Sequence, residues 1–443
     1  MSPADNSPAT SVPGRASRPD SLPHLDILGH DVYEHGAPHA AYDEFRSTAP
    51  VAWINETAAN GHDGHGFWSL TAHRDVVAVH KDWRTFSSEV GGTEIEELER
   101  DAPALAARRT MLETDPPRHT KLRQLVNPAF SRMAVETYAQ HATSLMAEVL
   151  DDAMAAAHTT GSVDGVRAVA RELPIRMITG LLGVPDADAP QLFHWADQIV
   201  YNADPDYSPA VSDRTDTDPY RLLPFRSPVS LKVLDYVQRL SAARRGVAGG
   251  DVLSVLANAL VDGHPLTERE QGTFFLLLLI AGNETTRHAL SHGLLALAEH
   301  PDVLPLLRAQ PELLDSATEE VLRWTCPQLH FRRTATAATE IGGIKIAAGE
   351  KVVTWYLAAN FDPTVFADPH TFDIERTPNP HVTFGGGGPH LCLGQWMARL
   401  EVRTFLAALA QRADRVELAG EPRRVRSNFI NGLKLLPLHL VPR

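Results

Sequence analysis

A single cysteine at the mouth of a predicted helix is the residue of this sequence best suited to metal chemistry. Cys392 follows a run of glycines that begins at Gly385, and apolar residues at helical spacing continue after it to Leu406. Cysteine binds a metal as the thiolate, and a sulfur in the first turn of a helix is stabilised as a thiolate by the helix dipole and by unpaired backbone N–H groups. Cys392 is therefore predicted to lie in the first helical turn and to be a metal ligand.

The glycines before Cys392 admit three interpretations. Without side chains they let the backbone pass close to a flat cofactor. A glycine-rich loop can also cradle phosphate, but no Gly-Lys-Ser/Thr follows and no strand-to-helix dinucleotide pattern surrounds this one. The third interpretation is a loop beside a buried and inert cysteine. The loop alone does not decide between the first interpretation and the third.

An acid and an alcohol stand side by side in an otherwise apolar stretch. Glu284 and Thr285 follow Ala281 and Gly282, whose small side chains leave room for a planar cofactor or a diatomic ligand to approach the backbone. Burial of such polar groups is costly unless they are paired, which indicates a functional reason for their position. The alternative is that the Thr285 hydroxyl only bonds back to a carbonyl of its own helix.

Two further pairs have helical spacing. His119 and Arg123 come just after a pair of prolines that can end one element and start a helix, and their separation of four places them on one helical face. Two donors on one face can hold a carboxylate, or they can belong to a solvated basic face. Glu320 and Arg323 are three residues apart and can form a charged, hydrogen-bonded pair.

The elements that must position these residues are mainly helical. Thr267 and Glu270 form a predicted capping box, and the apolar pattern after it runs to His300, long enough for a helix of about 50 Å at 1.5 Å per residue. Segments 340–346 and 350–355 are typical of paired strands around glycine turns. Segments 85–110 and 202–230 lack sustained periodicity and are predicted to be long connections, which in a compact enzyme are often functional.

The composition excludes two classes of protein. The chain has 443 residues, of which 43% are hydrophobic, enough for a substantial core. No stretch reaches the roughly 18 apolar residues that a membrane helix needs. The formal net charge of -14 argues against a nucleic-acid binder, which needs a basic face to neutralise phosphates.

Cysteine usage and the N-terminal residues predict a cytoplasmic protein. The chain has 2 cysteines, too few for a disulfide framework, which suits a reducing compartment. Residues 1–23 are rich in Ser, Pro and Ala and lack the pattern of a secretory signal, so they are predicted to be a flexible tail. Residues 24–443 are predicted to form one catalytic domain.

In their order along the chain, these motifs resemble those of the cytochrome P450 family. The run 384–394 is similar to the family's haem-binding loop, and segments 115–123, 281–286 and 320–323 resemble three further family motifs. The resemblance implies a mainly α fold with small β-sheets, in which the haem lies between a long central helix and the helix after the cysteine. The spacing from the phenylalanine of the loop to its cysteine is one residue longer than in most members, and this form resembles the actinobacterial steroid and methyl-branched lipid hydroxylases.

The resemblance implies a role for each matching residue. Cys392 would be the iron ligand of haem b, and Glu284 with Thr285 would relay protons to dioxygen. Glu320 and Arg323 would form a buried structural pair. The other implied haem-binding positions are His119, Arg123, Arg333, His390, Phe384, Gly385, Gly394, Ala281 and Gly282. The implied substrate contacts are Leu277, Gln328, Leu329, His330 and Ile430.

The implied activity is that of a monooxygenase. It would use O2 and two externally supplied electrons to hydroxylate a C–H bond of a hydrophobic terpenoid, steroid or branched lipid. No stretch resembles a flavin or iron–sulfur domain, so the electrons would come from a separate ferredoxin and ferredoxin reductase. Arg118, Arg399 and Arg403 form either a basic docking patch for that ferredoxin or ordinary surface charges. A monomer is expected.

Two other functions stay open from the sequence. One is a biosynthetic enzyme that acts on a natural-product intermediate by hydroxylation, epoxidation, desaturation or coupling. The other is a haem-thiolate sensor without turnover. The pair Glu284 and Thr285 argues against the sensor, because a sensor has no need to deliver protons.

Overall fold

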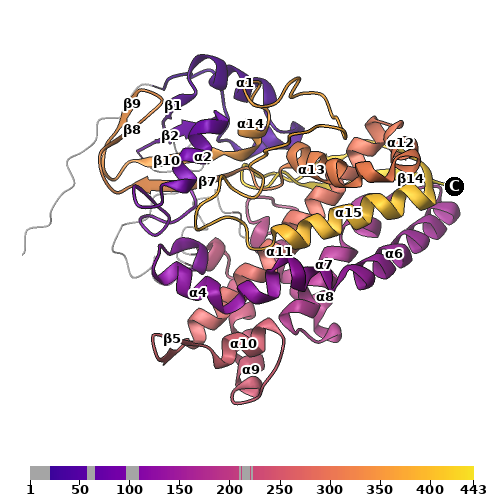
Figure 1. Cartoon of the computed structure of the whole chain (residues 1–443), viewed down its shortest axis with the longest axis horizontal. Coiled ribbons are helices and arrows are strands. Elements are labelled where there is room, and N and C mark those ends of the chain that lie inside the picture. The colour runs from indigo at the N-terminus through magenta and orange to yellow at the C-terminus, as the bar shows by residue number, and fades with distance from the viewer. Residues whose placement is uncertain (1–19, 57–64, 96–108, 209–210, 212–219, 221–222) are drawn as a thin grey trace, which may run out of the picture.

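The computed structural model describes residues 20–56, 65–95, 109–208, 211, 220 and 223–443, and helices make up most of it (Figure 1). The helices are α1 (His39–Thr48), α2 (His73–Lys81), α4 (Arg118–Val126), α5 (Arg132–Glu136), α6 (Ala139–Thr160), α7 (Glu172–Leu182), α8 (Ala189–Val200), α9 (Ser230–Arg244), α10 (Val252–Asn258), α11 (Glu268–Glu299), α12 (Val303–Ala309), α13 (Leu314–Thr325), α14 (Tyr356–Asn360) and α15 (Gln395–Arg412). The strands are β1 (Val51–Ile54), β2 (Phe67–Leu70), β3 (Phe86–Ser87), β4 (Val163–Asp164), β5 (Leu260–Val261), β6 (His264–Pro265), β7 (His330–Ala335), β8 (Thr339–Ile341), β9 (Ile344–Ile346), β10 (Lys351–Trp355), β11 (Ala413–Leu418), β12 (Arg423–Arg424), β13 (Leu433–Leu435) and β14 (Pro437–Pro442). The expected mainly α fold with small β-sheets is confirmed.

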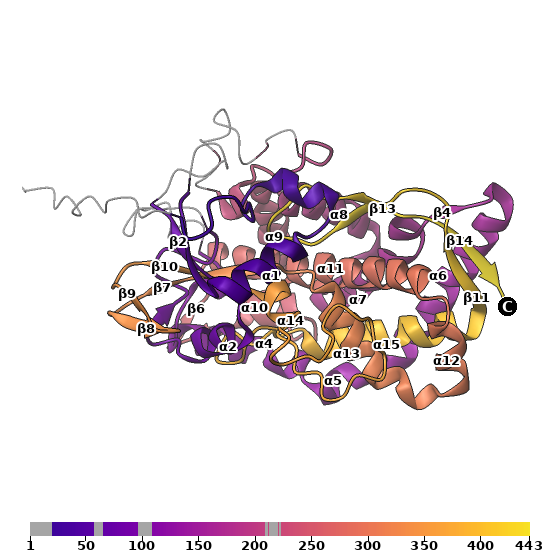
Figure 2. The same ribbon diagram turned by 90° about the horizontal axis from the view of Figure 1, so that it is seen from above.

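Helix α11 is the long central helix that the sequence predicts. The Thr267 hydroxyl accepts from the backbone N–H of Glu270, whose carboxylate accepts in return from the backbone N–H of Thr267, so the capping box is present. The helix crosses the middle of the molecule and packs against α7, α9, α13 and α15 (Figure 2). Because neighbours cover it on almost every side, its apolar residues face all directions rather than one stripe.

The hydrophobic interior is divided into two main cores. The larger core is helical and is built by α6, α7, α11, α13 and α15. The second core lies under a five-stranded sheet with the strand order β1-β2-β10-β7-β3, on the left in Figure 1. The chain segments that line the functional site come from both parts of the molecule.

The sheet corrects one prediction about strand pairing. Strand β10 pairs in parallel with β2 and antiparallel with β7, whereas β8 and β9 form a separate hairpin with each other. The two runs predicted to pair, 340–346 and 350–355, therefore do not pair with each other. Local turn residues predict the β8–β9 hairpin, whereas β10 pairs with β7, the strand before that hairpin, and with β2, which lies far away along the chain.

The predicted tail and connections are only partly described. Asp20 and Ser21 belong to the predicted tail, yet both are attached to the chain around β1. The Asp20 carboxylate accepts from the backbone N–H of Asn55, and Ser21 exchanges two hydrogen bonds with the backbone of Trp53. Residues 1–19 of the tail, 96–108 of the first connection and 209–210, 212–219 and 221–222 of the second lie outside the described residues.

Candidate active site

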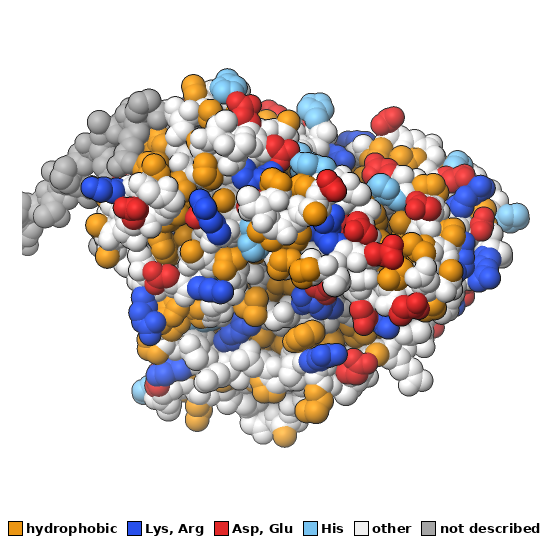
Figure 3. Space-filling model, turned by 45° about the horizontal axis from the view of Figure 1, so that its top comes forward, with side chains coloured by type: hydrophobic (Ala, Val, Ile, Leu, Met, Phe, Trp, Pro, Cys, Tyr) orange, Lys and Arg blue, Asp and Glu red, His pale blue; other side chains and the backbone are white. Residues whose placement is uncertain are grey.

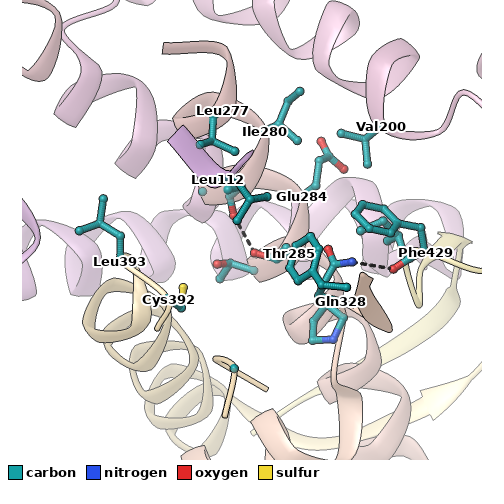
Figure 4. Close-up of a pocket in the computed structure, with 18 of the residues that line it drawn as sticks. Leu112, Val200, Leu277, Ile280, Glu284, Thr285, Gln328, Cys392, Leu393 and Phe429 are labelled. Carbon is teal, nitrogen blue, oxygen red and sulfur yellow. Dashed lines mark hydrogen bonds between the residues drawn. The ribbon is translucent and has the colours of Figure 1, made fainter. Parts of the chain in front are cut away.

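A large pocket brings together nearly all the residues singled out by the sequence. It has a volume of about 320 Å³ and lies between α11, the loop that carries Cys392, the start of β7 and the turn 427–430 (Figure 4). The predicted residues in its wall are Leu277, Ala281, Gly282, Glu284, Thr285, His119, Arg123, Arg333, Phe384, Gly385, His390, Cys392, Gly394, Gln328, His330 and Ile430.

The sulfur-bearing loop precedes α15 instead of opening it. Helix α15 begins at Gln395 with Gly394 as its N-cap, so Cys392 is not in the first helical turn as predicted. Its backbone N–H donates to the carbonyl of Phe384 at 2.9 Å, which closes the loop. Burial raises the pKa of the Cys392 thiol, while a hydrogen bond from the Gly394 backbone and the charge of Arg123 act in the opposite direction. The sulfur faces the pocket (Figure 4).

Two glycines let this loop pack against α2. A Cβ atom added to Gly386 would lie 2.7 Å from the Cα of Val77, and one added to Gly388 would lie 2.1 Å from the carbonyl oxygen of His80. Gly388 also has a φ of +73°, in the left-handed region that favours glycine. The glycine run is therefore required for close contact with α2, and its backbone fixes the position of Cys392.

Four basic side chains gather at one side of the pocket. His119 and Arg123 come from α4, Arg333 from β7 and His390 from the sulfur-bearing loop, and the rings of His119 and His390 lie 4.1 Å apart. Nδ1 of His119 and Nε2 of His390 are buried without a hydrogen-bond partner. Among the described residues, no carboxylate bonds to any of the four.

Burial leaves this basic cluster electrostatically unsatisfied. It lowers the pKa of His119 to about 4 and the pKa of His390 well below its usual range. It also lowers the pKa values of Arg123 and Arg333, whose hydrogen bonds in the described structure go to backbone carbonyls and to a histidine. An anionic group in the pocket would offset the cost of burying these donors.

The polar pair on α11 has two different surroundings. The Thr285 hydroxyl donates to the Ala281 carbonyl at 2.7 Å. This bond to a carbonyl of its own helix is the alternative to a functional role that the sequence leaves open. Glu284 is completely buried and accepts hydrogen bonds from Tyr201, Arg287 and Asn283. Burial raises the pKa of Glu284, while the neighbouring Arg287 lowers it.

The pair Glu320 and Arg323 is buried, in line with its predicted structural role. Both side chains are fully inaccessible, and two hydrogen bonds of 2.8 and 2.7 Å join them. Arg323 also donates to the carbonyls of Asn360 and Pro369, and Glu320 accepts from Arg376 and Asn379. The pair thus fastens the segment that leads into the sulfur-bearing loop and does not line the pocket.

One residue predicted to contact the substrate lies outside the pocket wall. Leu329 is fully buried in the second core and does not line the pocket, whereas its neighbours Gln328 and His330 do. Successive side chains of an extended chain point to opposite sides, which explains the difference. The Gln328 amide donates to the carbonyls of His330 and Phe429, which fixes the side chain in the wall (Figure 4).

Sequence reasoning missed several buried polar residues around the site. Asp197 of α8 and Tyr201 directly after this helix reach the surroundings of Glu284 from far away in the sequence, and no local pattern indicates this contact. Glu401 lines the pocket from α15, is almost fully buried and has an oxygen without a hydrogen-bond partner. A carboxyl group within the apolar helical run after Cys392 is a signal from which the sequence could have indicated that Glu401 is special.

The three arginines considered as a docking patch are all paired with acids. Arg399 binds Glu319 through two hydrogen bonds of 2.7 and 2.9 Å. Arg403 pairs with Asp315 at 2.7 Å, and Arg118 pairs with Glu270. Acidic and basic side chains are also interspersed over the face in Figure 3.

None of the helices in the described part of the chain combines the length and the apolar composition that a membrane span requires.

Three comparisons relate the chain to known proteins. The family model "Cytochrome P450" matches residues 238–423. The chain is 35% identical to a steroid C26-monooxygenase of Mycobacterium tuberculosis, over 96% of this chain and 94% of that protein, and 36% identical to a methyl-branched lipid omega-hydroxylase of the same species, over 97% and 98%. A Mycobacterium marinum cytochrome P450 solved in complex with pseudoionone superposes with a TM-score of 0.84 at 34% identity, covering 96% of this chain and 100% of that one. This chain belongs to the cytochrome P450 family and is a haem-thiolate monooxygenase.

Proposed function

We propose that the enzyme hydroxylates a C–H bond of a hydrophobic terpenoid, steroid or branched lipid. The observation that carries this substrate class is the apolar wall of the pocket on the α11 side. This wall consists of Met111, Leu112, Ile178, Leu181, Ile199, Val200, Leu277 and Ile280. The relatives named above act on steroids and methyl-branched lipids, which supports the same class.

The experiment that tests the substrate class is a titration of the ferric holoenzyme with sterols, terpenoids and branched fatty acids. A compound that fills the pocket displaces water and shifts the spin state, so the Soret band moves to shorter wavelength. Saturable shifts with members of these classes are expected. Shifts confined to polar polyketide-like or peptide-like compounds would overturn the proposed class.

We infer that the cofactor is haem b and that the described residues fit it. The unpartnered donors of His119 and His390, with Arg123 and Arg333, suit the two propionate groups of a haem, and Cys392 would ligate the iron. Phe384, Gly385, Gly394, Ala281 and Gly282 would border the macrocycle. When bound, a thiolate-ligated haem supplies the oxygen activation, because the electron-rich sulfur favours cleavage of the O–O bond. The carbon monoxide complex of the reduced protein should have the strongly red-shifted Soret band of thiolate ligation; an ordinary haem-protein band would contradict the role of Cys392.

We assign proton supply to Glu284 and Thr285. Insertion of one oxygen atom of O2 into a C–H bond releases the other as water and consumes two protons and two electrons. Thr285 lies in the wall of the pocket and Glu284 is its neighbour on α11. The Thr285 hydroxyl can donate to a pocket group by leaving the Ala281 carbonyl, while Glu284 holds an exchangeable proton beside it.

We further propose the setting in which the enzyme works. Residues 24–443 form one catalytic domain of a monomeric, cytoplasmic protein, and a separate ferredoxin with its reductase supplies the electrons. The ion pairs of Arg118, Arg399 and Arg403 offset their positive charge, so these arginines act as ordinary surface charges. Docking then depends on shape and apolar contact more than on a basic patch.

A biosynthetic role on a natural-product intermediate is the second candidate. The observation in its favour is that Asn202, Gln328, Ser427 and Asn428 line the pocket wall. These side chains are hydrogen-bonded to backbone groups, and their remaining polar capacity would suit a polar substrate. Under this alternative, the compounds that shift the spin state would carry several hydroxyl or amide groups. The titration described above therefore separates the two candidates.

A further inference from the structure

Tyr201 is the centre of a buried hydrogen-bonded network that joins α8 to the acid on α11. It follows directly after α8, is completely buried, and its hydroxyl contacts Glu284, Arg287 and His288, all on α11. Arg287 also bridges to Asp197 on α8 at 2.9 Å. The network is built only from residues that the sequence motifs leave out, apart from Glu284.

The direction of each hydrogen bond in this network can be assigned. The backbone N–H of Leu433 points at Nδ1 of His288 at 3.3 Å, so Nδ1 is an acceptor. Burial and the charge of Arg287 lower the pKa of His288 well below its usual range, so the ring is neutral and carries its proton on Nε2. Nε2 therefore donates to the Tyr201 oxygen.

The remaining donors determine where the Tyr201 proton points. Arg287 is a donor only and also points at the Tyr201 oxygen, so both acceptor positions of that oxygen are filled. The Tyr201 hydroxyl must then donate to the Glu284 carboxylate. The other carboxylate oxygen accepts from Asn283 at 2.6 Å. This set of donors favours the ionised form of Glu284 and opposes the effect of its burial.

The same turn of chain also forms part of the pocket roof. This part of the roof consists of Ile199 and Val200 at the end of α8 and of Asn202 and Ala203 after it. Tyr201 lies between them and points into the network instead. Figure 4 shows Val200 and Glu284. A movement of this turn therefore changes the hydrogen bond between Tyr201 and Glu284.

We propose that Tyr201 is the positioning residue for Glu284: it holds the carboxylate against α8, favours its ionised form and links proton supply to the position of the pocket roof. The inference rests on the proton-supply role proposed above for Glu284. The titratable groups around Glu284 are Asp197 of α8, Tyr201 and Tyr207 in the chain after α8, and Arg287 and His288 on α11.

The test follows the protonation of Glu284 in the ferric holoenzyme by infrared spectroscopy. The carbonyl band of the protonated Glu284 side chain is identified by its absence in Glu284→Gln, and its pH dependence is measured. In Tyr201→Phe the band should persist to a higher pH, by about one unit, because a donor to the carboxylate is lost. Tyr207→Phe is the matched control, since the Tyr207 ring packs against that of Tyr201 in a tilted arrangement, with centroids 4.7 Å apart, and no hydrogen bond from its hydroxyl to Glu284 is present in the described structure.

The opposite shift is expected from a second variant. In Asp197→Asn the band should be lost at a lower pH than in the wild type, because Asp197 raises the pKa of Glu284. This variant leaves the packing of Tyr201 intact and keeps the test decisive if Tyr201→Phe does not retain haem. An unchanged titration in Asp197→Asn, or in a folded Tyr201→Phe, overturns the inference.

The outcome separates this inference from the proposed function. If Glu284→Gln keeps the wild-type ratio of product to NADH consumed, Glu284 does not supply protons and the proposed role fails, whatever the infrared titration gives. If that ratio falls in Glu284→Gln while the titration is the same in Tyr201→Phe, Tyr207→Phe and wild type, only the role of Tyr201 is wrong.

Discussion

Ionisable side chains of opposite kinds occupy different parts of the pocket wall. His119, His390 and Arg333 are donors without a carboxylate partner in the described structure, whereas Glu284 and Glu401 are buried carboxyl groups elsewhere in the wall. Donors that lack partners suit a resident anion, and carboxyl groups whose pKa is raised by burial can hold protons. At the scale of single residues, the pocket thus separates the binding of a charged cofactor from the handling of protons.

Removal of the Thr285 hydroxyl tests its part in proton supply. Thr285→Ala should bind haem and substrate like the wild type, because the hydroxyl contacts only the Ala281 carbonyl within the described structure. Product formed per NADH should fall by about 10-fold or more, the order expected for loss of a proton-transfer group, and hydrogen peroxide should rise in its place. Thr286→Ala, next to it on α11, is the control. Tight coupling in Thr285→Ala would mean that the hydroxyl has no catalytic role.

The buried Glu401 makes a separate prediction about pH and stability. Burial raises the pKa of Glu401 well above its usual range, so the folded protein keeps a proton that the unfolded chain loses above about pH 4.3. The unfolded state then binds fewer protons, and stability falls as the pH rises towards the folded pKa. Glu401→Gln should remove this slope, which is at most about 1.4 kcal/mol per pH unit.

Urea unfolding of the holoprotein at about pH 5, 6.5 and 8 measures this effect. As the pH rises, the free energy of unfolding of Glu401→Gln should increase relative to that of the wild type. Glu312→Gln, at an exposed carboxyl on the surface, controls for the loss of one charge. Parallel pH profiles for Glu401→Gln and wild type would show that Glu401 is ionised in the folded protein.

At the scale of elements, the loop that carries Cys392 depends on its contact with α2. Gly386→Ala places a Cβ atom 2.7 Å from the backbone of Val77, which cannot move without displacing α2. A loss of about 1–3 kcal/mol of stability is expected from such overpacking, together with weaker retention of haem. Chemical unfolding and the haem content of the purified protein measure both effects.

Gly180→Ala is the matched control for that variant. Gly180 lies in α7, and a Cβ added to it meets no atom within 4 Å. The substitution should stabilise the protein by about 0.5–1 kcal/mol, because alanine favours the helix more than glycine does. Equal stability of Gly386→Ala and wild type would mean that the loop does not need its close contact with α2.

The sequence predicted elements whose signals are local. The capping box of Thr267 and the apolar run after it indicated α11 almost to its ends, and the spacing of Glu320 and Arg323 indicated their pairing. The start of α15 was predicted too early because a glycine, Gly394, is the N-cap and carries no side-chain capping signal. The family motifs indicated which residues meet in the pocket, while the contact between Tyr201 and Glu284 depends on tertiary packing of α8 and could not be predicted.

At the scale of the whole molecule, charge bears on the encounter with an electron donor. The formal net charge is -14, and Arg399 and Arg403 are paired with acids. A basic patch would make reduction by an acidic ferredoxin steeply dependent on ionic strength, because salt screens exposed charges within about 10 Å at 0.1 M. Without such a patch, raising the salt from about 0.02 to 0.2 M should change the second-order rate by less than about threefold.

Stopped-flow reduction of the holoenzyme by an acidic ferredoxin measures this dependence. Arg403→Gln should leave the rate within about twofold of the wild type, because its charge is exposed and already paired. A rate that falls steeply with salt, and falls further in Arg403→Gln, would restore the basic docking patch.

The fastening of the sulfur-bearing loop has a consequence for how the enzyme matures. Glu320, Arg323 and Asn360 hold the chain ahead of the loop, and the glycines hold the loop itself against α2, all through contacts between protein groups. The apoprotein should therefore have the thiol in place before the cofactor arrives. Cells grown with little iron should accumulate folded chains that take up haem after synthesis, without a further folding step.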